Sequence, residues 1–192
     1  MSVVAAVLAA GSSRRLGAPK QLLPLYGERS LVHHAAAEVL ASGAGRVAVI
    51  VGAHAAAVSR AVAELDVELV HNLDHAEGLA SSIRAAVAWA RYSRAEALLL
   101  SLCDQPRLSR FHLRRLLDEA QARADRPAAS YYAGKPAVPA VFPARYFEDL
   151  FTLEGDRGAA SLLRSSPGLS LVPWPEGELD IDIQADVQRC SS

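Results

Sequence analysis

The chain has 192 residues, of which 51% are apolar, and a formal net charge of −1. This charge excludes general electrostatic attraction to nucleic acid or to an anionic membrane, and no apolar run approaches the length of a membrane span. The length predicts a single domain, residues 1–192, with a substantial core. The two cysteines, Cys103 and Cys190, lie far apart and suggest no disulfide framework, so we expect a cytoplasmic protein.

Strand-like and helix-like segments alternate along the first two-thirds of the chain. Apolar runs predict buried strands at 3–8, 46–52, 67–70 and 97–102. Helices are predicted from Ser30 to about Gly43, and at 53–65, 81–92 and 109–124. This order predicts an α/β fold, namely a doubly wound, mostly parallel sheet with helices on both faces.

The pattern changes after Arg126. Two short strands, 128–132 and 139–142, are predicted around Gly134-Lys135-Pro136 and form a hairpin or small β insertion. A short helix at 159–163 and a strand near 169–172 follow. We therefore expect the parallel sheet in the first part of the domain and a different arrangement in the last third.

The loop after the first strand indicates a binding site for a nucleotide polyphosphate. Lys20 and Arg14 are expected to supply positive charge to the phosphate oxygens. Because Gln21 follows Lys20, the loop is not a Walker A motif, and its two glycines are too few for the dinucleotide fingerprint. The alternative is a simple βα connection with solvated arginines. The small residues whose backbone can approach phosphate are Leu8, Ala9, Ala10, Gly11, Ser12 and Ser13.

A carboxylate follows the strand predicted at 97–102. Asp104 lies where the carboxyl ends of parallel strands form a ligand crevice, which the loop at Gly11 also borders. Nucleotidyl transfer needs a divalent cation, and Mg²⁺ takes one or two carboxylates together with triphosphate oxygens. Asp104 is therefore the first candidate metal ligand. The alternative is an aspartate that caps a turn before Pro106.

A second candidate ligand lies near the end of the chain. In Asp180-Ile181-Asp182-Ile183, acidic and apolar residues alternate, which puts both aspartates on one face of a strand. Asp182 is the preferred metal ligand, and Asp180 is the other candidate. The alternative is a cluster of negative charge at a helix N-terminus.

The loop also resembles a known family signature. The run Leu8-Ala9-Ala10-Gly11-Ser12-Ser13-Arg14-Arg15-Leu16-Gly17-Ala18-Pro19-Lys20 is similar to Leu-Ala-Ala-Gly-x-Ser-x-Arg-x-Gly-x-x-Lys of nucleotidyltransferases. With the Gln21-Leu22-Leu23-Pro24-Leu25 that follows, it resembles the MobA-like NTP transferases, especially their molybdenum-cofactor cytidylyltransferase (MocA-like) branch. The resemblance implies a Rossmann-like nucleotidyltransferase fold of the GT-A type.

Four further segments resemble this family. Cys103-Asp104-Gln105-Pro106 matches its Asp-Gln-Pro segment, which carries the metal aspartate, and 180–186 resembles its C-terminal Asp-Ile-Asp segment with three replacements. Segment 77–84 resembles a segment beside the nucleotide, which implies contacts from Ser81 and Ser82, although helix capping explains both serines equally well. Segment 155–159 resembles an acceptor-side loop. Residues 1–125 would then bind the nucleotide and 126–192 the acceptor.

The resemblance implies a Mg²⁺-dependent transferase that moves CMP from CTP, or a nucleotide from another NTP, to a molybdopterin-type phosphate and releases pyrophosphate. Asp104 and Asp182 would hold Mg²⁺, and Lys20 and Arg14 would neutralise developing charge. The methyl group of Ala10 would crowd a purine, which favours CTP. An apo-molybdoenzyme is a further implied partner. Departures around Ala137 keep a sugar-phosphate acceptor open, and a non-catalytic module that delivers nucleotide or pterin is a further candidate function.

Overall fold

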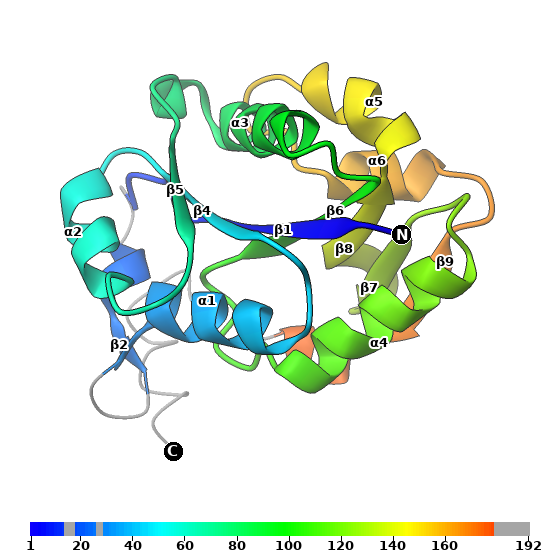
Figure 1. The fold of residues 1–192 in the computed structure, drawn as a ribbon, viewed down its shortest axis with the longest axis horizontal. Helices are drawn as coiled ribbons and strands as arrows, with labels where there is room; N and C mark the ends of the chain where they lie inside the picture. Colours follow the sequence, from blue (N-terminus) through cyan, green and yellow to red (C-terminus); the bar gives the residue numbers. More distant parts are fainter. Residues whose placement is uncertain (14–17, 26–28, 179–192) are drawn as a thin grey trace.

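A computed structural model describes residues 1–13, 18–25 and 29–178 as one α/β domain (Figure 1). Within these residues, a seven-stranded sheet has the order β5-β4-β1-β6-β8-β7-β9, and β2 and β3 form a separate two-stranded sheet. The strands are β1 Val3–Leu8, β2 Pro24–Leu25, β3 Arg29–Ser30, β4 Val47–Val51, β5 Glu68–His71, β6 Ala97–Leu102, β7 Ala128–Tyr132, β8 Lys135–Pro143 and β9 Ser170–Pro173. The α-helices are α1 Leu31–Ala41, α2 Ala55–Ala61, α3 Leu79–Tyr92, α4 Arg110–Ala122, α5 Phe147–Phe151 and α6 Ala160–Ser165.

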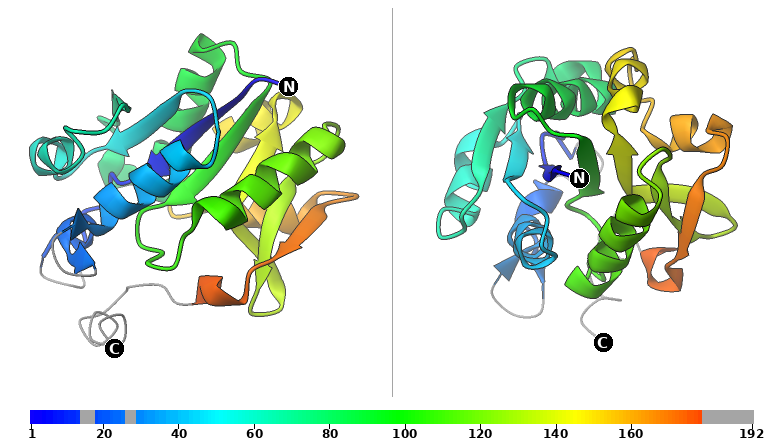
Figure 2. Two further views of the ribbon diagram at one scale, coloured as in Figure 1. Left: turned by 60° about the horizontal axis from the view of Figure 1, so that its bottom comes forward. Right: turned by 45° about the vertical axis from the view of Figure 1, so that its right-hand side comes forward.

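The parallel half of the sheet is the doubly wound arrangement that the sequence predicts. Strands β5, β4, β1 and β6 pair in parallel, and the chain runs outward from β1 to β4 and β5 before it returns to β6. Helices α1 and α4 cover one face of the sheet, and α3, α5 and α6 cover the other (Figures 1 and 2). The prediction of an α/β, mostly parallel sheet with helices on both faces is therefore confirmed.

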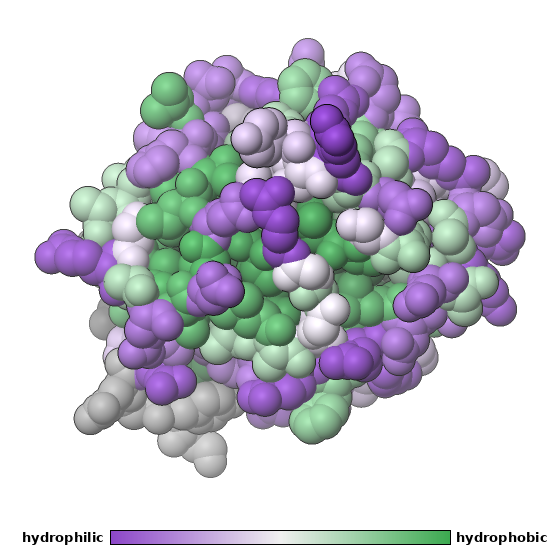
Figure 3. Space-filling view, in the orientation of Figure 1, coloured by the Kyte–Doolittle hydropathy of each residue, from purple (hydrophilic) through white to green (hydrophobic). Residues whose placement is uncertain are grey.

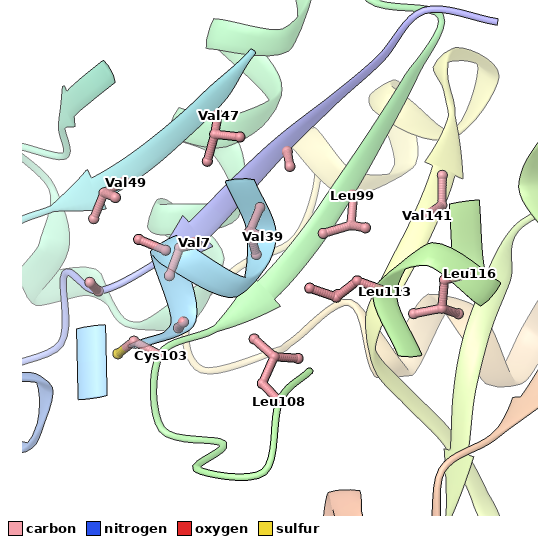
Figure 4. Close-up of a cluster of buried hydrophobic side chains, with 14 of the residues drawn as sticks. Val7, Val39, Val47, Val49, Leu99, Cys103, Leu108, Leu113, Leu116 and Val141 are labelled. Atoms are coloured by element: carbon pink, nitrogen blue, oxygen red, sulfur yellow. The ribbon is translucent and has the colours of Figure 1, made fainter. Parts of the chain in front are cut away.

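Both faces of the central strands are buried, because successive side chains of a strand point to opposite faces. Val7 of β1 and Leu99 of β6 pack with Val39 of α1 and Leu113 of α4 on one face (Figure 4). The intervening residues of the same strands pack against α3 and α5 on the other face. Continuous apolar runs, rather than alternating ones, follow from this double burial.

The predicted hairpin is part of the main sheet rather than an appendage. Strand β8 runs antiparallel between β6 and β7, and β9 then pairs with β7 in parallel. Strand β8 is longer than the sequence predicts, because its residues pair with β7 at one end and with β6 at the other. Residues Ala140–Phe142 are completely buried there.

Helix boundaries differ from the prediction at two places. Helix α2 covers only Ala55–Ala61 rather than 53–65, and α3 begins at Leu79, two residues earlier than expected. The predicted N-caps are confirmed, since the Ser30 and Ser109 side chains accept hydrogen bonds from the third following backbone N–H. No helix in the described ranges is long and apolar enough to cross a membrane. In the orientation of Figure 1, hydrophobic residues gather in the middle of this face, and hydrophilic residues surround them and partly cross them (Figure 3).

Candidate functional site

A cavity of about 530 Å³ opens at the carboxyl ends of β1 and β6. These two strands are neighbours, but the connections that leave them run in opposite directions, and ligands of doubly wound sheets bind at such a point. Segments from four parts of the chain line the cavity: Leu8, Ala9, Ala10, Gly11, Ser12, Ser13, Lys20, Gln21, His75, Ala76, Glu77, Gly78, Leu79, Ser82, Leu102, Cys103, Asp104 and Asp156.

Lys20 and Asp104 meet in this cavity although they are 84 positions apart in the chain. The Nζ atom of Lys20 lies 2.5 Å from Oδ2 of Asp104, so the two side chains form a charge-assisted hydrogen bond. The exposed fractions of the two side chains are 25% and 13%. Because the pair is mostly withdrawn from water, its charges are screened less than those of a surface ion pair.

The second carboxylate oxygen of Asp104 is a candidate cation ligand. Oδ1 is buried, and it has no hydrogen-bond partner among the described residues. A carboxylate oxygen buried in this way is costly unless it binds a donor or a cation. Within the described ranges, no three His, Cys, Asp or Glu side chains are placed so that they could hold a metal ion together. Further ligands would therefore come from a bound phosphate or from residues outside these ranges.

The neighbouring Cys103 is not suited to bind metal or to attack a substrate. It is buried, and this burial, with a smaller contribution from the charge of Asp104, raises the pKa of its thiol. Metal binding and nucleophilic attack both require the thiolate. Cys103 therefore acts as a small apolar residue in the core (Figure 4).

The backbone of the loop at Gly11 is held by a buried glutamine. The Gln21 side-chain nitrogen, Nε2, donates to the carbonyl oxygens of Ala9 at 3.1 Å and Gly11 at 2.5 Å. Its oxygen, Oε1, accepts from the Ser13 hydroxyl at 3.1 Å, and that hydroxyl accepts from the Lys20 N–H. One buried side chain thus fixes both the loop and the start of the turn that carries Lys20.

This anchoring decides which way the loop presents its N–H groups. In a trans peptide the carbonyl and the next N–H point to opposite sides. Since the Ala9 and Gly11 carbonyls point at Gln21, the N–H groups of Ala10 and Ser12 point away from it. The Ala10 carbonyl accepts from the Ala53 N–H, so the Gly11 N–H points away from Ala53. The loop can therefore offer successive N–H groups to an anion.

The two predicted serines differ in their position. Ser82 lines the cavity, whereas Ser81 is buried beside it and donates to the Gly78 carbonyl at 2.8 Å. The Asn72 side chain donates to both hydroxyls, at 2.8 and 3.1 Å, and so fixes the first turn of α3. Ser81 therefore contributes to the framework of the site, and Ser82 is the one that a ligand in the cavity can reach.

The structure adds residues that were not among the predicted site residues. Gln21, His75 and Glu77 line the cavity, and Asp156 reaches it from the segment expected to face the acceptor. Gln21 and Glu77 belong to segments that resemble the family, but no role was predicted for either residue. Nothing in the local pattern of Gln21 indicates its burial. Asp156 did carry a signal, because it belongs to the segment 155–159 that resembles a family loop. Arg14, Asp180 and Asp182 lie outside the described residues, so their proposed roles stay predictions.

Fold and cavity together define a nucleotidyltransferase-type domain, in which a loop of small residues and a lysine–aspartate pair line one cavity. The chain belongs to the MobA-like NTP transferase domain family, whose model matches residues 5–170. It is 36% identical over 174 residues to nicotine blue oxidoreductase of Paenarthrobacter nicotinovorans, covering 87% of this chain and 84% of that protein. It is 31% identical over 188 residues to the purine catabolism protein PucB of Bacillus subtilis, covering 93% and 90%.

Solved structures agree with this assignment. Rv0371c of Mycobacterium tuberculosis is 30% identical and superposes with a TM-score of 0.81 over 99% of this chain and 97% of its own. A structure of Rv0371c in complex with manganese gives a TM-score of 0.80, with 99% and 98% of the two chains covered. A relative with this fold thus binds a divalent cation.

Proposed function

We propose that the chain is a Mg²⁺-dependent nucleotidyltransferase that transfers CMP from CTP to the phosphate of a molybdopterin-type acceptor. The observation that carries the proposal is the Lys20–Asp104 pair, which lines the same cavity as the loop at Gly11. In the reaction an acceptor phosphate oxygen bonds to the α-phosphorus of the nucleotide. The bond from that phosphorus to the bridging oxygen breaks, and pyrophosphate leaves.

The residues present fit a divalent cation. Asp104 would hold it through the buried Oδ1, which has no hydrogen-bond partner among the described residues, and Asp182 is the proposed second ligand. Such a cation supplies charge neutralisation of the triphosphate and polarises the phosphorus that is attacked. The manganese complex of the relative Rv0371c supports this assignment.

Lys20 and the loop bind and orient the triphosphate. The N–H groups of Ala10, Gly11 and Ser12 donate to phosphate oxygens, and Gln21 holds the peptides so that no reorganisation is needed on binding. The Lys20 ammonium stays at Asp104 Oδ2 before the nucleotide arrives. It then stabilises charge on the departing pyrophosphate, and Arg14 is the proposed second cation.

Ala10 supports the choice of a pyrimidine base. It lines the cavity, it is 2% exposed, and its methyl group packs against Gly52 so closely that a Cβ atom at Gly52 would lie 2.8 Å away. This wall has no room to move back and admit a larger base. The Ala10 methyl group would therefore exclude a purine at this wall and accept the smaller base of CTP.

A second candidate activity is oxidation or reduction with a dinucleotide. It is favoured by the 36% identity to nicotine blue oxidoreductase. The same loop could bind a pyrophosphate, but the sequence lacks the three-glycine fingerprint of dinucleotide-binding folds. Two further candidates are a sugar-phosphate transferase and a nucleotide-binding delivery module without turnover.

One experiment separates these activities. Pyrophosphate release is measured with Mg²⁺, purified molybdopterin, and CTP, GTP or ATP in turn, for the wild type, Asp104→Asn and the control Asp118→Asn. Asp118 is an exposed carboxylate on α4. We expect release with CTP, a loss of about 100-fold or more in Asp104→Asn, and no change in Asp118→Asn.

Each different outcome points to a different activity. Release that depends on a sugar phosphate instead of molybdopterin would replace the acceptor. Oxidation of NADPH without pyrophosphate release would favour the oxidoreductase. Binding of CTP with no release under any condition would leave the delivery module, and equal activity of wild type and Asp104→Asn would contradict the proposed metal ligand.

A further inference from the structure

In this structure the Lys20 ammonium occupies one oxygen of the candidate cation ligand. Its Nζ atom lies 2.5 Å from Oδ2 of Asp104, and both side chains are mostly withdrawn from water. Water therefore screens the attraction between the two charges only in part. The negative charge that would attract a divalent cation to Asp104 is thus already balanced by a cation of the protein itself.

A divalent cation on the same carboxylate would lie close to the Lys20 ammonium. If it bound the buried Oδ1, it would share one carboxylate group with the ammonium and stand within about 7 Å of it, because Mg²⁺–oxygen distances are about 2.1 Å. This separation is shorter than the Debye length at physiological ionic strength, so dissolved salt weakens the repulsion little. Lys20 and a free cation therefore oppose each other at Asp104.

A bound nucleotide would remove this conflict. Lys20 lines the cavity of about 530 Å³ together with the loop at Gly11, and we call this space the nucleotide cavity. Triphosphate oxygens held by the loop would offer the ammonium a partner with more negative charge than one carboxylate. Movement of the ammonium to the phosphate would leave the Asp104 carboxylate to the cation, and phosphate oxygens would supply further ligands.

A lysine is suited to such a movement. Lys20 and Lys135 are the only lysines among the 20 lysine and arginine residues of the chain. An arginine holds a carboxylate through a rigid planar fork, as Arg46 does with two hydrogen bonds to Glu68, whereas a lysine is a point charge on a flexible stem. The Lys20 backbone N–H is fixed by the Ser13 hydroxyl at 3.0 Å. The change of partner therefore needs only a rotation of the lysine side chain.

We infer that Lys20 sets the order of binding, because it opposes a free divalent cation at Asp104 and admits the cation together with the nucleotide. The inference rests on the proposed function, which supplies the triphosphate that draws the ammonium away. By linkage, nucleotide and cation then strengthen each other's binding. Removal of the lysine charge should strengthen binding of the free cation and weaken binding of the nucleotide. A lysine that acted on the phosphate alone would leave the affinity for the free cation unchanged.

The test is direct binding of Mn²⁺ to the full chain without nucleotide or acceptor, followed by the electron paramagnetic resonance signal of the free ion. We expect Lys20→Met to bind Mn²⁺ about tenfold or more tightly than the wild type. Lys20→Arg keeps the charge and should stay within about threefold of the wild type. The control Lys135→Met, at an exposed lysine that does not line the nucleotide cavity, should leave the affinity unchanged.

Two further measurements locate the effect. The gain in Mn²⁺ affinity should disappear in the double variant Lys20→Met with Asp104→Asn. In the presence of Mn²⁺, CTP should bind Lys20→Met about tenfold or more weakly than the wild type, as isothermal titration calorimetry would show. Since Lys20→Met leaves a mostly buried carboxylate without its partner, this variant should be less stable, and Mn²⁺ should raise its Tm by more than that of the wild type.

A measurement on the wild type needs no folded variant of Lys20. Lysine labelled with ¹³C at Cε gives two side-chain signals in this chain, and the signal that Lys135→Met retains belongs to Lys20. We expect CTP with Mg²⁺ to shift the Lys20 signal, and millimolar Mg²⁺ alone to leave it in place.

Three results would overturn the inference. These are Mn²⁺ binding by Lys20→Met that is no tighter than in the wild type, tighter binding that persists in the double variant, and a Lys20 signal that Mg²⁺ alone shifts as much as Mg²⁺ with CTP. Failure of the proposed function is distinguishable, because none of these measurements needs an acceptor or turnover. The expected binding pattern without pyrophosphate release would keep the role of Lys20 and reject the transferase. Pyrophosphate release with an unchanged Mn²⁺ affinity in Lys20→Met would do the reverse.

Discussion

The two adjoining cavities differ in how their polar groups are arranged. In the nucleotide cavity, Lys20 bonds Asp104, and Gln21 bonds two carbonyls and a hydroxyl, so the loop is held by protein partners before any ligand arrives. The second cavity, of about 230 Å³, is lined mostly by apolar residues of β6, β8 and α6, and we call it the β6 cavity. Its two cations, Lys135 and Arg164, are exposed and form no ion pair with a described residue. The polar groups of the first cavity are therefore preorganised by protein partners, whereas the cations of the second cavity have no such partner among the described residues.

The largest expected effect concerns Lys20 in the nucleotide cavity. Lys20→Met removes the cation while it keeps much of the side-chain length, and we expect pyrophosphate release to fall about 100- to 1,000-fold in kcat/KM. The KM for the acceptor should change little, because Lys20 is proposed to contact the triphosphate rather than the acceptor. Steady-state kinetics with each substrate varied in turn measures both quantities.

Lys20→Arg is the matched control for this variant. It keeps the charge but spreads it over a planar fork, so an intermediate loss is expected. If Lys20→Met instead raised the acceptor KM alone, the proposed contact of Lys20 with the triphosphate would be wrong.

A smaller effect is expected from the side chain that orients the loop. Gln21→Leu leaves the Ala9 and Gly11 carbonyls without their donor, which should cost about 1–3 kcal/mol in the free energy of unfolding. The loop should also lose its orientation, and the KM for the nucleotide should rise roughly tenfold. Urea denaturation and initial-rate kinetics give the two numbers. A nucleotide KM equal to that of the wild type would show that the loop needs no anchor.

The next variant changes Gly78, which packs against the segment around Asp156. Gly78 has φ +114°, and a Cβ atom there would lie 2.7 Å from the Gly155 carbonyl oxygen. Gly78→Ala should therefore cost about 1–3 kcal/mol and displace the segment around Asp156, which lines the nucleotide cavity. Differential scanning fluorimetry should show a lower Tm.

Gly78→Ala should also affect function. Gly158 and Ala159 follow in the same segment and line the β6 cavity, so the displacement should reach both cavities, and the KM for the nucleotide should rise. Gly134→Ala is the control, because a Cβ atom there meets nothing within 4 Å although the residue also has a positive φ. If Gly78→Ala and Gly134→Ala lowered the Tm and weakened nucleotide binding equally, the effect would come from the backbone conformation alone.

The smallest expected effect concerns His112, a buried histidine of α4 next to β7. His112 stacks on Trp174 with 4.7 Å between ring centroids, and its Nε2 bonds the Ser130 hydroxyl at 2.7 Å. Since that hydroxyl donates to the Pro139 carbonyl, the histidine Nε2 carries the proton and Nδ1 does not. Burial, with a smaller contribution from Arg115, lowers the pKa of His112 to about 4.

The lowered pKa makes stability depend on pH. Between the unfolded pKa of 6.5 and the folded value of about 4, the unfolded chain binds more protons, so this contribution to stability is present above pH 6.5 and lost as the pH falls toward 4. The loss should be up to about 2 kcal/mol between pH 7 and pH 4.5. In His112→Gln this part of the pH dependence should be absent, as urea denaturation at the two pH values would show. If the free energy of unfolding fell equally in the wild type and in His112→Gln, the pH dependence would come from other groups.

Much of the fold follows from local patterns in the sequence. Apolar runs at 3–8 and 97–102 locate β1 and β6, Ser30 and Ser109 mark the helix starts, and the order of elements specifies the doubly wound part. These signals suffice because the strands are buried on both faces and the caps act within a single turn. The long β8 strand was only half predicted, since its pairing with both β6 and β7 is set by distant segments.

The sequence by itself also determined which groups are available for the candidate nucleotide site. The small residues and Lys20 come after the strand at 3–8, and Asp104 comes after the strand at 97–102. Only the tertiary structure decided that Lys20 meets Asp104, that Gln21 lies beneath the loop, and that Ser82 rather than Ser81 faces the cavity. It also formed the β6 cavity from strands, a hairpin and a helix that are distant in the chain. The physical reason is that a motif records which groups are present, whereas distance, burial and hydrogen-bond partners depend on how the sheet and helices pack.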